Sequence, residues 1–468
     1  MIHFGTGGWR AVIGDDFTKE NVRLLSAALA RRMKAEGQDH IVIGYDRRFL
    51  SQEAAHWSAE VFAGEGIGVY LIDREAPTPL IMYTVKYYAL QYGLAVTASH
   101  NPAIYNGIKV FVRGGRDADE IFTASLEKEI AAASPDTILS LPYETGVHDG
   151  VIQIINPMNE YIDSIIRSLN MDAIRSRNLR VALDPMYGVS KTALQTILLT
   201  ARCDVDVIHE RRDALFGGRL PAPNHKTLAG LMNFVEEHGC DIGIATDGDA
   251  DRLGVVDDRA SFLHPNEILV LLYYYLLRYK GWRGAAVRNL ATTHLLDRIA
   301  EKYGETCYEV PVGFKYISAK MTETNAIIGG ESSGGLTVRG HIQGKDGIYA
   351  GALLVEMIAT TGRKLSEIYQ EITDQFGTYE MAETDFRFTA ERRQEITKKL
   401  MEDRQLPDFG IEIERVSYLD GCKVYFKGNG WLSARFSGTE PLLRIFCEMP
   451  RYEQALSLAR QMAEFLGL

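Results

Sequence analysis

Short apolar segments that pass into polar turns recur at three widely spaced places in the chain. They are IVIGYD at 41–46, VALDPMYG at 181–188 and AAVRNLATT at 285–293. Sequences with helical periodicity follow them, such as KTALQTILL and THLLDRIAEKYG. Strands that alternate with helices predict α/β layers. The wide recurrence indicates three related α/β units, although the pattern alone does not establish a repeat.

The C-terminal part has a different pattern. Strand-like runs, ERVSYLDGCKVYFKGNGWLSARF and PLLRIFCE, come first, and the helical YEQALSLARQMAEFLG follows. This order predicts a separate α+β domain. The chain has 468 residues, and because a compact domain takes roughly 100–200 residues, three or four domains are expected. Turn-rich or polar stretches place the predicted domains at 1–150, 151–257, 258–372 and 373–468.

Composition narrows the classes of function. The formal net charge is −11, and an acidic chain gains nothing from neutralising nucleic-acid phosphates. The five cysteines are scattered without a CxxC spacing, which disfavours a disulfide framework or zinc site and favours a reducing compartment. The N-terminus lacks a signal-peptide pattern. The longest apolar run, Ile268–Leu277, is shorter than the roughly 20 residues of a membrane span and predicts a buried helix. We therefore expect a cytoplasmic protein that binds neither nucleic acid nor membranes.

The segment GLAVTASHNPAIYNGIKV at 93–110 contains a candidate nucleophile. Its apolar run GLAV predicts a strand that delivers Ser99 and His100 into a turn formed by Asn101 and Pro102. A serine at the exposed end of a strand is well placed for nucleophilic chemistry. Alternatively, Ser99 only shapes the turn, and the pattern leaves both interpretations open. A Gly-x-Ser-x-Gly elbow is missing from the sequence, which disfavours an α/β-hydrolase.

The segment DIGIATDGDADRLGVVDD at 241–258 predicts a metal site. Asp247, Asp249 and Asp251 alternate in a glycine-containing loop between two strand-like runs. Such spacing lets hard oxygen ligands converge on one divalent cation, and oxygen-only ligands favour Mg²⁺. An EF-hand loop is excluded because Arg252 stands where that motif needs glycine. The alternative is a solvated acidic turn, but carboxylates about 4 Å apart repel by several kcal/mol at an effective dielectric of about 20.

Two further loops combine small and polar residues. GGESSGG at 329–335 makes Glu331 and Ser333 candidates for contacts to sugar hydroxyls, with a simple glycine-rich turn as the alternative. ARFSGTEPLLR at 434–444 turns between two strand-like runs. Its hydroxyls, backbone N–H groups and Arg435 suit a phosphate dianion. Neither a Walker loop nor a GxGxxG fingerprint occurs in the sequence, so a bound nucleotide is not expected.

Together with FGTGGWR near the N-terminus, these four loops resemble the α-D-phosphohexomutase family, which includes phosphoglucomutases and phosphomannomutases. The specific motifs are TASHNP with NGIK, DGDADR, GGESSG and RFSGTEP, and they extend from Phe4 to beyond Arg444. The resemblance implies an α/β fold with three similar α/β domains with mixed sheets plus a smaller C-terminal α+β domain around a central cleft. It also implies an isomerase that works as an intramolecular phosphotransferase.

The resemblance assigns roles to the matching residues. Ser99 is similar to the serine that carries the phosphoryl group, and one of its phosphate oxygens would complete the metal site. The implied Mg²⁺ ligands besides Ser99 are Asp247, Asp249 and Asp251. The implied catalytic cations are Lys109, Arg10 and Arg252. The implied substrate contacts are Lys315, Glu331, Ser333, Arg435, Ser437, Gly438 and Thr439. Lys109 is a candidate general base, or alternatively acts only through its charge.

Two positions depart from the family pattern. Ala11 follows the arginine of GTGGWR, where many relatives have glycine. Gly335 follows the sugar loop's SG, where mannose-using and glucosamine-using relatives often have histidine. We therefore expect glucose phosphates first and mannose phosphates second. The sequence does not reveal the oligomeric state.

The resemblance implies a cycle of two phosphoryl transfers. Phosphorylated Ser99 converts a hexose 1-phosphate into a 1,6-bisphosphate, which turns around and returns its other phosphate to the serine. Mg²⁺ is the implied cofactor, and the hexose 1,6-bisphosphate is the intermediate and activator. The alternatives are a synthase that makes the bisphosphate from a separate donor, and a non-catalytic sensor of sugar phosphates.

Overall fold

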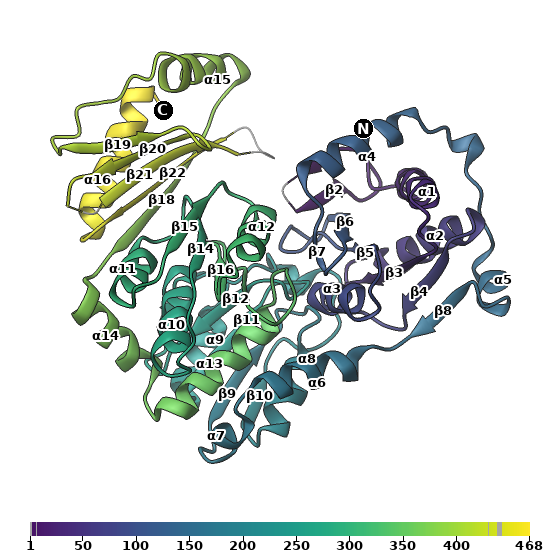
Figure 1. Ribbon diagram of the computed structural model, residues 1–468, viewed down its shortest axis with the longest axis horizontal. Coiled ribbons are helices and arrows are strands. Elements are labelled where there is room, and N and C mark those ends of the chain that lie inside the picture. Colours follow the sequence, from purple (N-terminus) through teal and green to yellow (C-terminus); the bar gives the residue numbers. More distant parts are fainter. Residues whose placement is uncertain (1, 6, 429, 438–441) are drawn as a thin grey trace. The chain divides into compact units, whose positions relative to one another are not determined.

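The computed structural model describes residues 2–5, 7–428, 430–437 and 442–468 (Figure 1). Its residues divide into two compact units. The first unit runs to Tyr275 and also contains Ser333–Glu367, whereas the second comprises Leu276–Ser332 and Ile368–Leu468. The chain therefore leaves the first unit, returns to it for one segment, and leaves it again.

The first sheet has the strand order β1-β2-β6-β5-β3-β4-β8, with the short β7 on β6. Its strands are β1 (Phe4–Gly5), β2 (Gly8–Val12), β3 (His40–Tyr45), β4 (Gly68–Ile72), β5 (Tyr92–Val96), β6 (Tyr105–Val112), β7 (Arg116–Asp117) and β8 (Ile152–Ile155). Strands β5, β3, β4 and β8 are parallel, and β6 and β2 are antiparallel to their neighbours. The sheet is therefore mixed.

Helices cover this first sheet. They are α1 (Lys19–Ala35), α2 (Ser51–Gly64), α3 (Thr78–Tyr87), α4 (Glu120–Ala132) and α5 (Tyr143–His148). Helices α1 and α2 pack against each other, and α3 packs on β3 and β5 (Figure 1). The run Ile41–Tyr45 in β3 is buried throughout, as is typical of a parallel strand covered on both faces.

The second sheet of the first unit has the order β10-β9-β11-β12-β13. Its strands are β9 (Arg180–Asp184), β10 (Asp204–Val207), β11 (Ile242–Thr246), β12 (Leu253–Val256) and β13 (Phe262–Leu263), with helices α6 (Met158–Ser168), α7 (Met171–Arg175), α8 (Lys191–Thr200) and α9 (Ala229–His238). Strands β10, β9 and β11 are parallel, and β12 and β13 are antiparallel to their neighbours. This sheet is also mixed.

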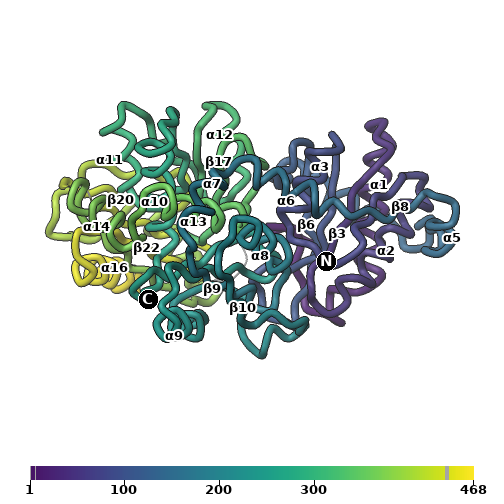
Figure 2. Tube along the Cα trace, turned by 90° about the horizontal axis from the view of Figure 1, so that it is seen from below, coloured from purple at the N-terminus to yellow at the C-terminus, as the bar shows by residue number. Residues whose placement is uncertain are grey.

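The segment that returns to the first unit supplies β17 (Leu336–Val338) and α13 (Gly347–Thr361). Helix α13 packs against α7 and α8 (Figure 2). Asp346 caps its N-terminus by accepting hydrogen bonds from the backbone N–H groups of Ile348 and Tyr349, both 2.9 Å. The residue directly before this cap is Lys345, which therefore has a fixed position at the start of a buried helix.

The second unit contains two sheets. The strands β14 (Ala286–Asn289), β15 (Cys307–Val310) and β16 (Ile328–Gly330) are parallel, with helices α11 (Leu295–Lys302) and α12 (Phe314–Thr324). The C-terminal sheet is antiparallel in the order β18-β22-β21-β20-β19. Its strands are β18 (Glu380–Arg387), β19 (Ile413–Ser417), β20 (Cys422–Phe426), β21 (Gly430–Phe436) and β22 (Leu442–Met449), with α15 (Ala390–Ile396) and α16 (Tyr452–Leu466). Helix α16 packs on β18 and β22.

The predicted architecture is confirmed: three α/β domains are followed by a C-terminal α+β domain. The predicted helix over the longest apolar run is α10 (Pro265–Arg278), and Ile268–Leu277 are buried. The described part of the chain contains no helix long and apolar enough to cross a membrane. Strands β8 and β13 continue the first and second sheets beyond residues 150 and 257. We therefore propose domain ends after Ile155 and Leu263, and a third after the helix α14 (Leu365–Phe376).

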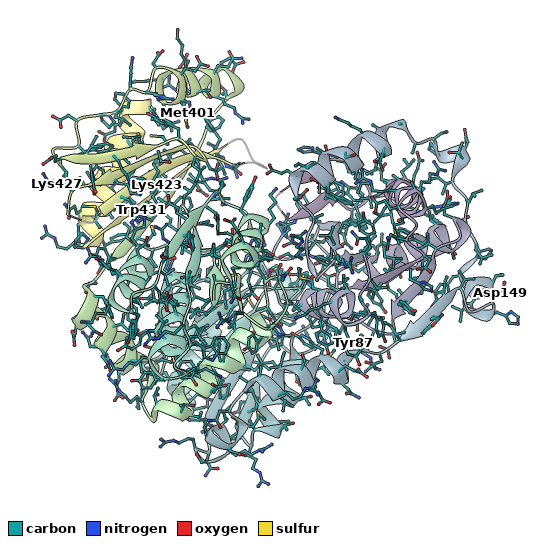
Figure 3. All side chains as sticks on the ribbon, in the orientation of Figure 1. Tyr87, Asp149, Met401, Lys423, Lys427 and Trp431 are labelled. Atoms are coloured by element: carbon teal, nitrogen blue, oxygen red, sulfur yellow. The ribbon has the colours of Figure 1, made fainter. Side chains whose placement is uncertain are left out.

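A buried polar network connects the two sheets of the second unit. Lys423 lies beside Trp431, with its ammonium 4.1 Å from the centre of the indole ring (Figure 3). The ammonium donates to the carbonyl of Leu290 at 2.5 Å and to Glu309 Oε2 at 2.7 Å. Arg288 also donates to Glu309 Oε2, at 2.6 Å. Two buried cations thus share the partly exposed carboxylate of Glu309.

The free energy of unfolding of the protein is expected to depend on pH through Lys423. Burial and the charge of Arg288 lower the pKa of Lys423 from 10.5 to about 7, against the opposing effect of Glu309 and Glu448. Between these two pKa values the unfolded chain binds a proton that the folded chain does not, so stability rises with pH in that window. The rise from pH 7 to 9 is at most about 2–3 kcal/mol, since one pKa unit corresponds to about 1.4 kcal/mol.

Urea unfolding at several pH values measures this rise, and Lys423→Met provides the comparison. The variant should show a smaller increase in the free energy of unfolding from pH 7 to 9 than the wild type. Tyr425 and His294 also face the ammonium, and both remain in the variant, so the difference between the two curves isolates Lys423. Parallel curves would contradict the expected titration.

Candidate active site

Ser99 lies three residues after the end of β5, in the first unit. Thr97 still pairs with the β6 strand, because its N–H donates to the carbonyl of Gly107 at 3.0 Å. The backbone then turns sharply, and Ser99 adopts a left-handed conformation with φ of 50°. Its hydroxyl donates to Asp247 Oδ2 at 2.7 Å and lies 3.3 Å from His100 Nδ1. The candidate nucleophile is thus in direct contact with the predicted metal loop.

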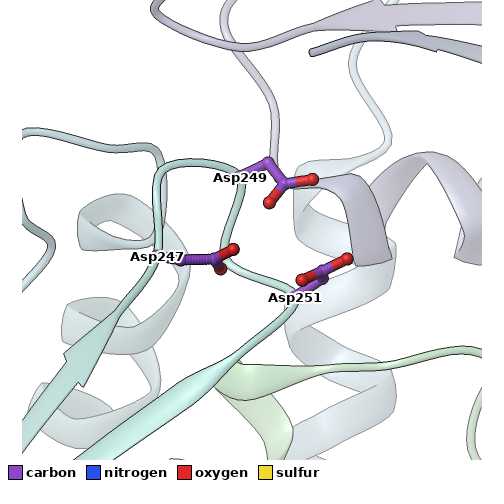
Figure 4. A group of neighbouring side chains, drawn as sticks. All are labelled: Asp247, Asp249 and Asp251. Carbon is purple, nitrogen blue, oxygen red and sulfur yellow. The ribbon is translucent and has the colours of Figure 1, made fainter. Parts of the chain in front are cut away.

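Asp247, Asp249 and Asp251 occupy the tight turn between the antiparallel strands β11 and β12. Their side chains point toward one another (Figure 4). All three residues are buried, and one carboxylate oxygen from each lies within 4.8 Å of the others. The sequence motif therefore forms the cluster that its spacing predicted.

The cluster fits a divalent cation. Asp249 Oδ1 and Asp251 Oδ1 are buried without a hydrogen-bond partner among the described residues. Burying carboxylate oxygens of this kind costs free energy unless they coordinate a cation. Burial, followed by the charges of Asp249 and Asp251, raises the pKa of Asp247 well above its usual value. A hard cation would relieve both the repulsion and the unsatisfied oxygens, and the ligand atoms are those that Mg²⁺ prefers.

Cations already surround the cluster. The Lys109 ammonium donates to Asp249 Oδ2 and Asp251 Oδ2, both at 2.7 Å. Burial alone would lower the pKa of Lys109, but these two carboxylates outweigh it and raise the pKa above 10.5. Arg252 Nε lies 4.0 Å from Asp251 Oδ1. Of the two roles predicted for Lys109, the charge of a stable ammonium is favoured over that of a general base.

Arg10 lies on β2 and donates from Nη1 to Asn101 Oδ1 at 2.7 Å. Burial, followed by the charge of Arg252, lowers the pKa of Arg10 from its usual value. The nearby Asp249 and Asp251 act in the opposite direction. The first unit thus brings together all the residues that the sequence analysis proposed for catalysis and metal binding.

Two residues of this site, Lys345 and Thr78, were not predicted from the sequence. Lys345 Nζ lies 2.9 Å from Asp251 Oδ2. Thr78, the first residue of α3, donates its hydroxyl to Asp249 Oδ2 at 2.7 Å. Lys345 is far in sequence from the three aspartates, and its position directly before the helix cap Asp346 was the only feature that marked it. Thr78 carried no local signal beyond the prolines on either side of it.

The predicted sugar loop divides between the two units. In the second unit Glu331 follows β16, and its Oε1 accepts hydrogen bonds from Asn289 Nδ2 at 3.1 Å and from the N–H of Gly313 at 3.2 Å. Lys315 lies in the first turn of α12, two residues after Gly313. Glu331 therefore connects its own loop to the N-terminus of α12, which bears Lys315. Ser333 lies in the first unit, at the start of the returning segment.

The predicted phosphate loop follows β21. Arg435 lies on that strand and forms an ion pair with Asp420, with Nη2 3.3 Å from Oδ2. The N–H of Ser437, directly after β21, donates to the carbonyl of Leu442, the first residue of β22, at 2.9 Å. Gly438 and Thr439, also predicted as substrate contacts, lie outside the described residues.

Comparison with known families agrees with this architecture. Four domain models of the phosphoglucomutase/phosphomannomutase family match in order. The α/β/α domains I, II and III match residues 1–136, 159–260 and 264–376, and the C-terminal domain matches 386–465. The chain belongs to the phosphoglucomutase/phosphomannomutase family. Its members are isomerases that act as intramolecular phosphotransferases.

Individual relatives span the whole chain. A phosphoglucomutase/phosphomannomutase from Thermococcus kodakarensis is 31% identical over 458 residues, which cover 97% of this chain and 95% of the relative. A proposed phosphoglucosamine mutase from Pyrococcus furiosus is 29% identical, with 98% and 96% coverage. The crystal structure of a proposed phosphomannomutase from Thermus thermophilus matches with a TM-score of 0.86, 30% identity and 99% coverage of both chains.

Proposed function

We propose that this chain interconverts hexose 1-phosphates and hexose 6-phosphates, with Ser99 as the carrier of the phosphoryl group. The observation that supports this most strongly is the 2.7 Å contact between the Ser99 hydroxyl and Asp247 in the buried carboxylate cluster. A serine at that position lies directly beside the carboxylates proposed to bind the metal. Such transfer depends on positioning and on charge stabilisation more than on covalent help from the protein.

Each half of the cycle moves one phosphoryl group. In the first, the bond between phosphorus and Ser99 Oγ breaks while a bond to the free hydroxyl oxygen of the hexose 1-phosphate forms. The proton of that hydroxyl ends on Ser99 Oγ, and the product is a hexose 1,6-bisphosphate. In the second half, Ser99 Oγ takes the phosphoryl group from position 1, its proton passes to the departing sugar oxygen, and hexose 6-phosphate remains. Asp247 Oδ2 accepts the hydrogen bond from the Ser99 hydroxyl and thereby orients the proton of that hydroxyl.

We assign the metal site to Asp247, Asp249 and Asp251, with Mg²⁺ as the cation. When bound, Mg²⁺ supplies positive charge that stabilises the negative charge developing on the serine oxygen. Phosphorylated Ser99 brings about two negative charges to a site that already holds three aspartates. Lys109 and Lys345 offset part of that charge from the protein itself, because both ammonium groups lie within 2.9 Å of Asp251.

We infer that glucose phosphates are preferred over mannose and glucosamine phosphates. Gly335 stands where the sequence analysis expected histidine in mannose-using and glucosamine-using relatives. A Cβ atom at Gly335 would lie 2.3 Å from Lys345 Cδ. A larger residue would therefore displace Lys345 from Asp251, so the contact between Lys345 and Asp251 depends on glycine at position 335.

A coupled assay with Mg²⁺ and a trace of glucose 1,6-bisphosphate tests the proposed function. Glucose, mannose and glucosamine 1-phosphates are offered separately. Formation of a 6-phosphate that stops on chelation would support the mutase and identify its sugar. Accumulation of bisphosphate at the expense of a separate donor would instead indicate the synthase. If folded protein phosphorylated at Ser99 turned over none of these sugars, the mutase proposal would be wrong, and a sensor would be favoured.

Arg435→Ala is expected to raise the KM for hexose phosphate by about 10- to 100-fold. The variant loses a charge-assisted contact to phosphate, and such contacts contribute roughly 1.5–3 kcal/mol. Steady-state kinetics measure the change. Arg415→Ala is the control, because Arg415 is an exposed arginine of the same sheet that stacks on Tyr425. An unchanged KM in Arg435→Ala would place the phosphate contact elsewhere.

A further inference from the structure

The backbone of Ser99 is bound on both sides to one buried ion pair. Its N–H donates to Thr97 Oγ1 at 2.9 Å, and the Thr97 hydroxyl donates to Asp46 Oδ2 at 2.6 Å. Its carbonyl accepts from Arg48 Nη2 at 2.5 Å. Arg48 Nε lies 3.4 Å from Asp46 Oδ2. These contacts form a closed ring around the candidate nucleophile, and we call Asp46, Arg48 and Thr97 the Ser99 clasp.

Arg48 also binds backbone carbonyls of other residues that follow Ser99. Its guanidinium also donates to the carbonyls of Asn101 at 2.6 Å, Pro102 at 2.9 Å and Tyr105 at 3.0 Å. A planar guanidinium with several fixed donors suits such multiple recognition, and a lysine ammonium does not. One side chain thus binds four carbonyls along the loop that leads from β5 to β6.

The clasp is itself fixed in place. The side chains of Arg48 and Asp46 are almost fully buried, with exposed fractions of 0% and 1%. Asp46 Oδ1 accepts from the N–H of Arg48 at 2.9 Å and from the Ser51 hydroxyl at 2.8 Å. The Arg48 guanidinium also lies over the ring of Phe216, 4.8 Å from its centre. A buried ion pair with this many partners is rigid, and removing one member leaves the other uncompensated.

The Ser99 turn needs such support. A left-handed conformation is uncommon for a residue with a side chain, and it persists only where the surroundings impose it. The direction of the Ser99 Oγ depends on this backbone conformation, because the contact to Asp247 spans only 2.7 Å. Small displacements of a reacting group are costly in rate even when the rest of the site is intact.

We propose that the Ser99 clasp is a positioning device that keeps the nucleophile directed at the carboxylate cluster throughout the cycle. This inference rests on the proposed function of Ser99 as the phosphoryl carrier. Arg48 and Asp46 make no contact with the reacting oxygen and act through the backbone of the serine. They are therefore positioning residues, and their removal should affect the rate of transfer and leave substrate binding intact.

Arg48→Met and Thr97→Val test the clasp. Thr97→Val retains the shape of the side chain and loses only the hydroxyl that connects Ser99 to Asp46. Each variant is expected to lower kcat by about 10²-fold with KM within about twofold of the wild type. Hydrogen exchange in a peptide spanning 97–106, measured by mass spectrometry on the unphosphorylated protein, should become faster in both. Thr97→Ser keeps a hydroxyl at this position and should therefore retain most of the wild-type kcat and most of the protection from hydrogen exchange.

Arg32→Met is the matched control. Arg32 lies in the same domain, its side chain is 10% exposed, and it forms an ion pair with Glu129. Its loss should lower the melting temperature without changing kcat or exchange in 97–106. If Arg48→Met and Thr97→Val kept the wild-type kcat, the positioning role would be wrong even where stability fell. A wild type without turnover would refute the proposed function, whereas unchanged exchange in both variants would separately refute the clasp.

Discussion

Ser99→Ala is expected to reduce hexose phosphate turnover by more than about 10⁴-fold, as removal of an attacking group does in other covalent mechanisms. The variant lacks the only oxygen through which Ser99 can carry a phosphoryl group. The fold should survive, since the substitution removes one hydrogen bond to Asp247, which contributes about 1 kcal/mol. Turnover is measured in the coupled assay. Intact mass after incubation with glucose 1,6-bisphosphate shows whether one phosphoryl group is added to the wild type and none to the variant.

Ser58→Ala controls for the loss of a buried hydroxyl. Ser58 is fully buried in the same domain and accepts a hydrogen bond from the Ser26 hydroxyl at 3.0 Å. This control should retain both turnover and phosphorylation. Phosphorylation of Ser99→Ala at another residue, with turnover preserved, would show that Ser99 is not the carrier.

The sequence predicted the fold well because its signals are local. The continuous apolar run of β3 and the periodic segments of α8 and α11 have the patterns that buried strands and amphipathic helices require. Domain ends were harder to place. Strand β8 is short and half exposed, and only its parallel pairing with β4 reveals that it extends the first sheet. Pairing between distant segments leaves little trace in a local pattern.

The candidate site was predictable where its residues share one loop. The three aspartates occur within five positions of one another, so their convergence follows from a single turn. The supporting residues do not share a loop. Lys345 reaches Asp251 because α13 packs in the first unit, and Arg48 reaches the Ser99 loop because β3 and β5 are neighbours in the first sheet. Such contacts depend on topology, and one sequence without its fold does not reveal them.

Asp249→Asn is expected to abolish the response to Mg²⁺ and reduce turnover by about 10³-fold or more, because the metal provides charge that no side chain replaces. The asparagine keeps the shape of the aspartate, and its carbonyl oxygen can still accept from Thr78 and Lys109, which donate to Asp249 Oδ2 at 2.7 Å. Its amide would take the place of Oδ1, which has no hydrogen-bond partner among the described residues. The substitution removes both a repulsion with the neighbouring aspartates and the ion pair with Lys109, so each protein is compared with its own metal-free form.

Thermal unfolding in chelator and in Mg²⁺ separates these effects. At a Mg²⁺ concentration about 100 times the dissociation constant, the wild type should gain about 2.7 kcal/mol, and the variant should gain almost nothing. Asp257→Asn is the matched control, because Asp257 is a buried aspartate of the same domain whose Oδ1 accepts from the N–H groups of Arg259 and Ser261. It should keep the full Mg²⁺ response. An equal response in Asp249→Asn would mean that the cation binds elsewhere, and the unsatisfied oxygens of the cluster would then need another explanation.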